Sequence, residues 1–241
     1  RAAGLAVLAP SLRGHGGAGY ETFWAEWRHQ SRDVLGAFDL VVRDPDRVLG
    51  GARRPEAVGV MAFGFGGLAA QAAFAEEPGI RALLLQGAVH DVRALFRQTA
   101  AKKASAPALL RDAIVQQAVA ITESSLKRRL FVEAEDRAPE FLRSRQGGVV
   151  GIIHSQDDRV VPMEQAALLK EALTAPRQQP IRVPLTWLPR AEACEGRRSP
   201  HLERPAEFAA HICGFWAASF PAAVNCSAAD AEVEAGLRAV G

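Results

Sequence analysis

Short apolar runs alternate along this chain with amphipathic stretches of helical period. The apolar runs, which are rich in Val, Ile and Leu and typical of buried strands, cover residues 4–10, 58–63, 80–89, 148–154 and 181–188. Helical patterns cover 22–42, the alanine-rich segment after Gly67 to about Glu77, the segment from Pro162 to Ala172, and a closing segment that ends at Ser219. Strands that alternate with helices predict an α/β fold with a mostly parallel sheet.

Two parts of the chain depart from this alternation. Residues 90–146 are helical and charged, with no strand signal, and they separate two predicted strands. Residues 222–241 are a tail of mostly small residues. We therefore expect one main domain over residues 1–221, with an insertion at about 90–146 and a C-terminal tail.

The turn after the second apolar run is the centre of the pattern. The run 58–63 meets a cluster of glycines, Gly64-Phe65-Gly66-Gly67, and continues as an alanine-rich helix. The frame Ala62-Phe63-Gly64-Phe65-Gly66 resembles Gly-x-Ser-x-Gly, the nucleophile elbow of α/β hydrolases, with glycine in the serine position. The elbow residue has a positive φ, which glycine adopts without strain. The other interpretation of Gly64 is an ordinary strand-to-helix turn.

Three further segments resemble the same family. Leu12-Arg13-Gly14-His15-Gly16 resembles the turn after its fourth strand, which makes His15 structural. The run from Ser155 to Pro162 resembles its acid loop, with Asp158 in the acid position and Asp157 as the alternative. The run from Ser199 to Phe208 resembles the segment after its catalytic histidine. The histidine position itself is Arg198, and His201 belongs to the flanking motif.

Elbow, acid loop and histidine loop follow one another in the order of the α/β hydrolases, and the region before the elbow is most similar to the prolyl oligopeptidase branch. The resemblance implies a mostly parallel sheet with helices on both faces and a helical cap at 90–146. It places the triad positions at Gly64, Asp158 and Arg198. Glycine offers no nucleophile, and arginine stays protonated and cannot act as a general base. Backbone N–H groups of Gly64 and Phe65 remain as donors for an anion or a carbonyl.

Two functions from different classes follow. The first is a catalytically degenerate protein that acts as a structural or binding subunit of a larger assembly. The second is a working esterase or peptidase with a displaced site, which would pair Cys194, Ser199 or Ser155 with His201 or His154. The loss of two triad members favours the first, because even one such loss costs several orders of magnitude in rate.

The resemblance also implies a missing strand. In α/β hydrolases the third strand lies between the fourth and the fifth, and this sequence begins after the third would have ended. Residues 5–9 and 57–63 would then have backbone N–H and C=O groups without hydrogen-bond partners inside the sheet. Each such buried group costs on the order of 1–3 kcal/mol. We expect a segment outside residues 1–241, from upstream in the same protein or from a partner chain, to fill the slot.

Composition limits the partners, cofactors and cellular compartment that we expect. A net charge of +2 over 241 residues gives no electrostatic reason to expect nucleic acid as a partner, and no apolar run is long enough to span a membrane. No cofactor motif or metal-ligand spacing is visible. Cys194, Cys213 and Cys226 are odd in number. We therefore expect no disulfide framework and a reducing intracellular compartment, the cytosol or an organelle matrix such as that of a mitochondrion or plastid.

Overall fold

The computed structural model describes residues 4–15, 27–103, 116–117, 120, 142–190, 204–221 and 224–227. Its elements, in chain order, are α1 (Trp27–Arg43), η1 (Pro55–Ala57), β1 (Gly59–Phe63), α2 (Gly66–Glu76), β2 (Ala82–Gln86), α3 (Val92–Lys103), β3 (Val149–Ile153), α6 (Glu164–Thr174), β4 (Arg182–Trp187) and α8 (Pro205–Ser219). The strands form one parallel sheet in the order β1-β2-β3-β4. The prediction of an α/β fold with a mostly parallel sheet is confirmed.

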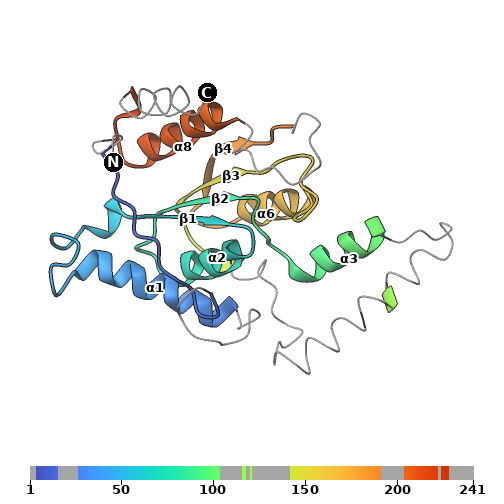
Figure 1. Ribbon diagram of the computed structural model, residues 1–241, viewed down its shortest axis with the longest axis horizontal. Coiled ribbons are helices and arrows are strands. Elements are labelled where there is room, and N and C mark those ends of the chain that lie inside the picture. Colours follow the sequence, from blue (N-terminus) through green and yellow to red (C-terminus); the bar gives the residue numbers. More distant parts are fainter. Residues whose placement is uncertain are drawn as a thin grey trace.

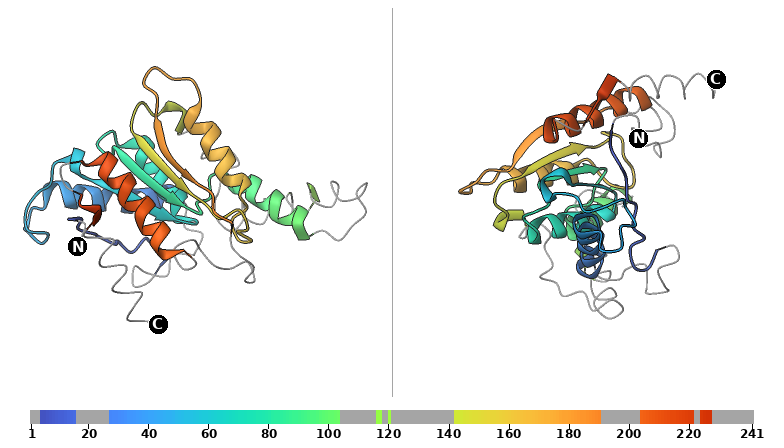
Figure 2. Two further views of the ribbon diagram at one scale, coloured as in Figure 1. Left: turned by 90° about the horizontal axis from the view of Figure 1, so that it is seen from above. Right: turned by 90° about the vertical axis from the view of Figure 1, so that its left-hand side faces the viewer.

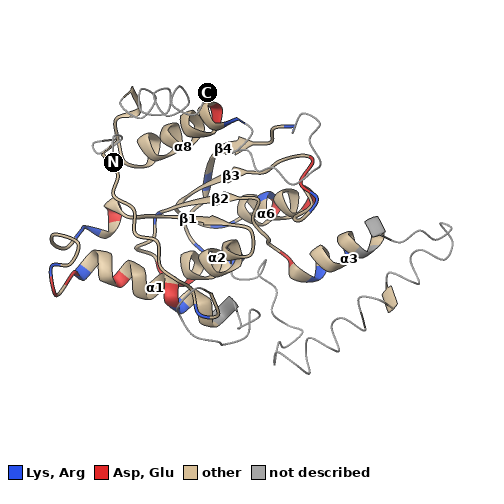
Figure 3. Cartoon of the chain, in the orientation of Figure 1, with Lys and Arg blue, Asp and Glu red and all other residues tan. Residues whose placement is uncertain are grey.

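Helices cover both faces of this sheet (Figure 1, Figure 2). On one face α2 and α6 lie against the strands, and α1 packs on the outer side of α2. On the other face α8 lies across the sheet. The central strands β2 and β3 are buried over their whole length, which is typical of parallel strands between two helical layers. Charged residues of both signs lie on the helices and loops and are rare on the strands (Figure 3).

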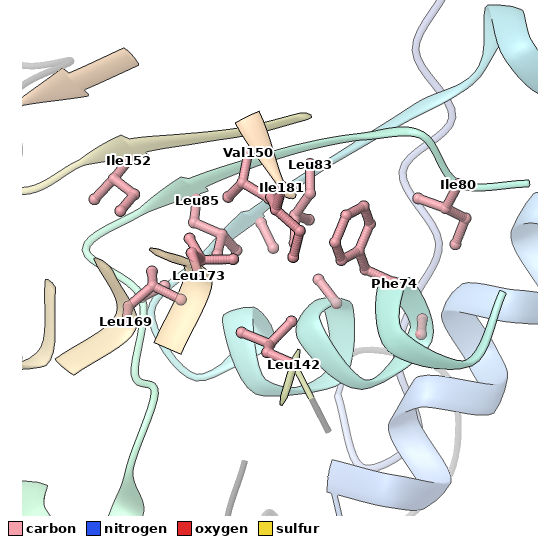
Figure 4. Packing of buried hydrophobic residues seen from close by; sticks show 14 of the residues in the cluster. Phe74, Ile80, Leu83, Leu85, Leu142, Val150, Ile152, Leu169, Leu173 and Ile181 are labelled. Carbon is pink, nitrogen blue, oxygen red and sulfur yellow. The ribbon is translucent and has the colours of Figure 1, made fainter. Parts of the chain in front are cut away.

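The two apolar cores follow from the alternation of side chains along the strands. Leu83 and Leu85 of β2 point to the α2 and α6 face, where they pack with Phe74 (Figure 4). Leu84, between them, points to the α8 face and packs with Phe215 and other aromatic residues of α8. Each face of the sheet thus has its own layer of buried side chains.

Glycines let α8 approach the sheet closely. A Cβ added at Gly59 in β1 would lie 2.3 Å from a ring carbon of Trp216, and one added at Gly151 in β3 would lie 2.9 Å from Phe215. The rings of Trp216 and Phe220 stack with centroids 5.7 Å apart. These aromatic side chains lie directly over the backbone of the strands, where a larger residue than glycine would displace them.

The prediction of a strand at residues 4–10 is wrong. These residues belong to no strand, and Val7 is 89% and Leu8 40% exposed. The segment is attached on both sides: Leu5 packs against the α8-side core, and the Arg13 guanidinium pairs with Asp33 of α1 at 2.6 Å. A strand exists only as part of a ladder, and an apolar run alone does not provide one. β1 pairs with β2 on one side and lies at the edge of the sheet on the other.

We expected no disulfide framework from the cysteines, but the structure contains a disulfide. Cys213 of α8 is bonded to Cys226, with the Cα atoms 5.5 Å apart. The fold brings the two residues together after α8 ends, which their number and spacing did not reveal. Disulfides persist in oxidising environments, so the cysteine argument for a reducing compartment no longer holds. Within the described part of the chain, no helix is long and apolar enough to cross a membrane.

The other predicted elements are present with shifted ends. The helix expected at 22–42 is observed as Trp27–Arg43, and residues 22–26 lie outside the described part. The strand expected at 80–89 is shorter, Ala82–Gln86, because the chain turns away at Gly87, whose φ is +52°. Of the insertion at 90–146, α3 and residues 142–146 are described almost completely, and most of the segment between them lies outside the described residues.

Candidate functional site

The turn between β1 and α2 has the geometry of an elbow. Gly64 directly follows the last residue of β1 and has a φ of +51°. Its N–H donates to the carbonyl of Gln86 at 3.1 Å, and its own carbonyl accepts from Gly67 and Val89. A Cβ added at Gly64 would meet nothing within 4 Å. The position therefore has room for a side chain and lacks one.

One expectation about this turn needs correction. The sequence suggested that the N–H groups of Gly64 and Phe65 could bind an anion or a carbonyl. The Gly64 N–H is occupied by the carbonyl of Gln86, because the turn continues the β1–β2 ladder by one hydrogen bond. Gly64 thus offers no donor to a ligand in this structure.

The second glycine of the helix start has a packing role. A Cβ at Gly67 would lie 2.5 Å from the Cβ of Ala88, in the loop that follows β2. This close approach brings the first turn of α2 against that loop. Beneath the turn, Leu68, Val89, Leu95 and Val161 form a small buried apolar cluster that joins α2, α3 and the acid loop.

The acid loop follows β3. The Asp158 carboxylate is half-buried, and its Oδ1 accepts hydrogen bonds from the N–H groups of Val160 and Val161, both at 2.8 Å. Its Oδ2 lies 3.4 Å from the position that a Cβ on Gly87 would take. Asp158 therefore braces its own loop. Asp157 is exposed, and its N–H donates to the Oγ of Ser155 at 3.4 Å.

The elbow and the acid loop meet at the end of β2. Gly64 bonds to Gln86, and Asp158 lies beside Gly87, the next residue along the chain. The N–H of Gly87 in turn donates to the carbonyl of Ile153 at the end of β3. Carboxyl ends of parallel strands are where α/β sheets place their sites, and two of the three predicted positions come together there.

The third position, Arg198, lies outside the described residues, as do Cys194, Ser199 and His201. Of the alternative catalytic residues, Ser155 and His154 are described. Both are buried, and the Nε2 of His154 lies 2.8 Å from the carbonyl oxygen of Val161, to which it donates. His154 thus supports the acid loop. His15 is exposed, with its Nδ1 3.3 Å from the carbonyl oxygen of Arg13.

Apolar side chains are exposed around this end of the sheet. Phe63 is 51% exposed and Phe65 36% exposed on either side of Gly64. Val160 is 66% exposed and Met163 36% exposed on the acid loop. Within the described part of the chain, no group of three or more His, Cys, Asp or Glu side chains is arranged to hold a metal ion.

A buried amide and imidazole network beside the elbow was not predicted. Gln71 of α2 donates through Nε2 to the carbonyls of Gly67 and Val89, and its Oε1 lies 2.6 Å from the Nδ1 of His90. Gln165 of α6 accepts from the N–H groups of His90 and Asp91. Burial lowers the pKa of His90 from 6.5 to about 4, against the opposing effect of Asp91. The sequence feature that could have revealed this network is a glutamine in the otherwise apolar face of each of two helices.

Sequence comparison finds no relative: no protein-family model and no curated protein matches this chain. Solved structures match its fold. BpoC from Mycobacterium tuberculosis H37Rv, assigned as a non-heme bromoperoxidase, is 15% identical, with a TM-score of 0.50 over 86% of this chain and 80% of its own. Rv0554 from the same species is 15% identical, with a TM-score of 0.50 over 86% of this chain and 77% of its own. Both are α/β-hydrolase-fold proteins. This chain has the α/β-hydrolase fold.

More distant α/β-hydrolase-fold structures include the esterase RhEst1 from Rhodococcus sp. ECU1013, which is 20% identical, with a TM-score of 0.44 over 86% of this chain and 78% of its own. The turn from β1 through Gly64 to α2 and the loop after β3 are the two segments whose sequences resemble the nucleophile elbow and the acid loop of this fold. The fold by itself does not determine the activity.

Proposed function

We propose that this α/β-hydrolase-fold chain is a pseudoenzyme that acts as a binding or structural subunit of a larger assembly. The observation that carries the proposal is Gly64. It has the positive φ and the open surroundings of an elbow residue, and it has no hydroxyl with which to attack a carbonyl. Asp158 bonds to its own loop, and the position expected for the general base is Arg198.

The test is reaction with a fluorophosphonate probe, which phosphonylates activated serines with loss of fluoride, together with turnover of a p-nitrophenyl ester. We expect no labelling and no turnover above background. The alternative is an esterase or peptidase with a displaced site, in which Cys194 or Ser199 acts with His201. The double variant Cys194→Ala with Ser199→Ala separates the two. Labelling or turnover that disappears in this variant supports the displaced enzyme, and turnover that survives it also contradicts the pseudoenzyme.

The partner would complete the sheet. β1 is an edge strand, and residues 4–10, which carry the exposed Val7, run as an unpaired segment between two attached ends. Edge strands are natural templates for a further strand. We propose that a segment outside residues 1–241, from upstream or from a partner chain, pairs with β1. Hydrogen exchange of the β1 amides tests this: protection should rise when the upstream segment or the co-purified partner is present.

We also propose that residues 90–146 form a cap on a domain of residues 1–221. α3 supports this, because it begins beside the candidate site and extends away from the sheet (Figure 1). The tail at 222–241 starts as part of the domain, since Val224 packs against the α8-side core and Cys226 is bonded to α8. Limited proteolysis that removes the insertion at 90–146 and leaves the remainder of residues 1–221 associated is the expected result.

A further inference from the structure

Gln165 attaches α3 to the body of the domain. It is fully buried at the start of α6, and both the oxygen and the nitrogen of its side-chain amide form hydrogen bonds. Its Oε1 accepts from the N–H groups of His90 and Asp91 at 2.9 Å each, and its Nε2 donates to the carbonyl of Asp91 at 3.1 Å and to Oε1 of Gln98 at 3.0 Å. Asp91 then caps α3, because its Oδ1 accepts from the N–H of Ala94 at 2.8 Å.

Apolar contacts add to this attachment of α3. Leu95 is buried and Val92 partly buried against Leu68, Val89 and Val161. The rest of the helix extends away from the sheet (Figure 1). The hydrogen bonds of Gln165 and these apolar contacts therefore meet at the base of the helix.

The proton on His90 can be placed from its neighbours. Both hydrogens of the Gln71 amide nitrogen are used by the carbonyls of Gly67 and Val89, so the Gln71 oxygen faces His90. The Nδ1 of His90 must then carry the hydrogen that this oxygen accepts at 2.6 Å. Nε2 is left as a bare acceptor, and it is buried without a hydrogen-bond partner.

Protonation of Nε2 would create a buried cation with a new N–H and no acceptor for it. Such a group is stabilised only by reaching water. His90 is adjacent to Asp91, the cap of α3, so an outward movement of His90 must also break the bonds from Gln165. We propose that Gln71, His90 and Gln165 form a proton-sensitive latch, which holds the base of α3 against α2 and α6 while His90 is neutral and releases it when Nε2 takes up a proton.

The charged groups around the latch do not offset this effect. Asp91 is the neighbour whose charge favours the protonated ring, and burial outweighs it. The charged residues of the described elements packed around His90 point to solvent: these are Glu76 of α2, Arg93 and Arg97 of α3, and Glu164, Lys170 and Glu171 of α6. Asp158, which is half-buried, bonds to its own loop.

The size of the effect follows from proton linkage. The pKa of His90 is 6.5 when the ring is released into water and about 4 when it is latched. The equilibrium constant for opening should therefore rise about 30-fold between pH 7.5 and pH 5. This inference goes beyond the proposed function, since the latch operates whether or not the chain is catalytic.

The test is hydrogen exchange with mass spectrometry on the full chain, corrected for the intrinsic pH dependence of exchange. In the wild type, the opening constant of the α3 amides should rise about 30-fold from pH 7.5 to pH 5, while β2 and β3 stay protected. His90→Asn keeps a donor for Gln71 but does not titrate, and should abolish the rise. Gln165→Leu should open α3 at every pH. His29→Asn, an exposed histidine on α1, is the matched control and should behave as wild type.

Three results would overturn the latch: opening of α3 that does not change with pH, the same rise in His90→Asn as in wild type, or exchange of α3 only together with β2. If His90→Asn does not fold, hydrogen exchange of the wild type at several pH values and an NMR titration of the His90 ring still test the proposal. A ring that titrates near 6.5 in the folded protein refutes the proposal.

Discussion

Gly64 offers a direct test of the proposed function, through the pair Gly64→Ser and Gly64→Ala. A Cβ at this position meets no atom within 4 Å, so neither variant should clash. The cost is the left-handed backbone at a φ of +51°, about 1–2 kcal/mol for a residue with a side chain. Reduced entropy of the unfolded chain offsets about 0.4–1 kcal/mol of this. We therefore expect both variants to lose about 1 kcal/mol of unfolding free energy.

The comparison variant is Gly151→Ala in β3. There the added Cβ would lie 2.6 Å from Leu84 and 2.9 Å from Phe215, inside a buried strand. Overpacking of this kind should cost about 1–3 kcal/mol, and more than either Gly64 variant. Urea unfolding followed by tryptophan fluorescence measures all three variants. A loss above about 3 kcal/mol in Gly64→Ala would show that the turn is not open.

The same two variants, Gly64→Ser and Gly64→Ala, also test the predicted lack of catalytic reactivity. Gly64→Ser should gain no reaction with a fluorophosphonate, because no base is expected near the new hydroxyl. Gly64→Ala carries the same backbone strain without a hydroxyl, so it isolates the chemistry from any structural change. Labelling of Gly64→Ser alone would refute the assignment of the histidine position to Arg198, and His201 would then be the residue to mutate next.

Three further changes have expected outcomes. Asp158→Ala leaves two backbone N–H groups of the acid loop without their acceptor and should cost about 1–2 kcal/mol in urea unfolding, with Asp158→Asn costing less; equal losses would contradict the bracing role. Arg145→Met keeps an apolar side chain beside Phe74 but removes the donors to four backbone carbonyls, and should lower the unfolding free energy by about 2–3 kcal/mol; a neutral result would refute that role. Cys226→Ser should cost about 2–4 kcal/mol under oxidising conditions and nothing when both proteins are reduced, and a loss that persists under reduction would show that the disulfide is not its cause.

The sequence by itself determined the elements of the central sheet and two positions of the candidate site. Strands such as β2 and β3 are buried on both faces, so their residues, apart from Gln86 at the end of β2, are apolar or small, and the run can be recognised in the sequence. The turn at Gly64 was equally visible, because a positive φ between a strand and a helix calls for glycine. Local rules of this kind act over a few residues and can be recognised without the fold.

Tertiary structure decided what depends on residues far apart in the chain. Residues 4–10 have the apolar pattern of a strand but no neighbouring ladder in the described structure, so they form none. Cys213 and Cys226 carry no spacing signal, yet the turn after α8 places them within bonding distance. Gln165 is an ordinary polar residue in the sequence and becomes the attachment of α3 because its partners lie 67–75 residues away. Hydrogen bonds and disulfides are specified by positions in space, which the order of residues alone does not contain.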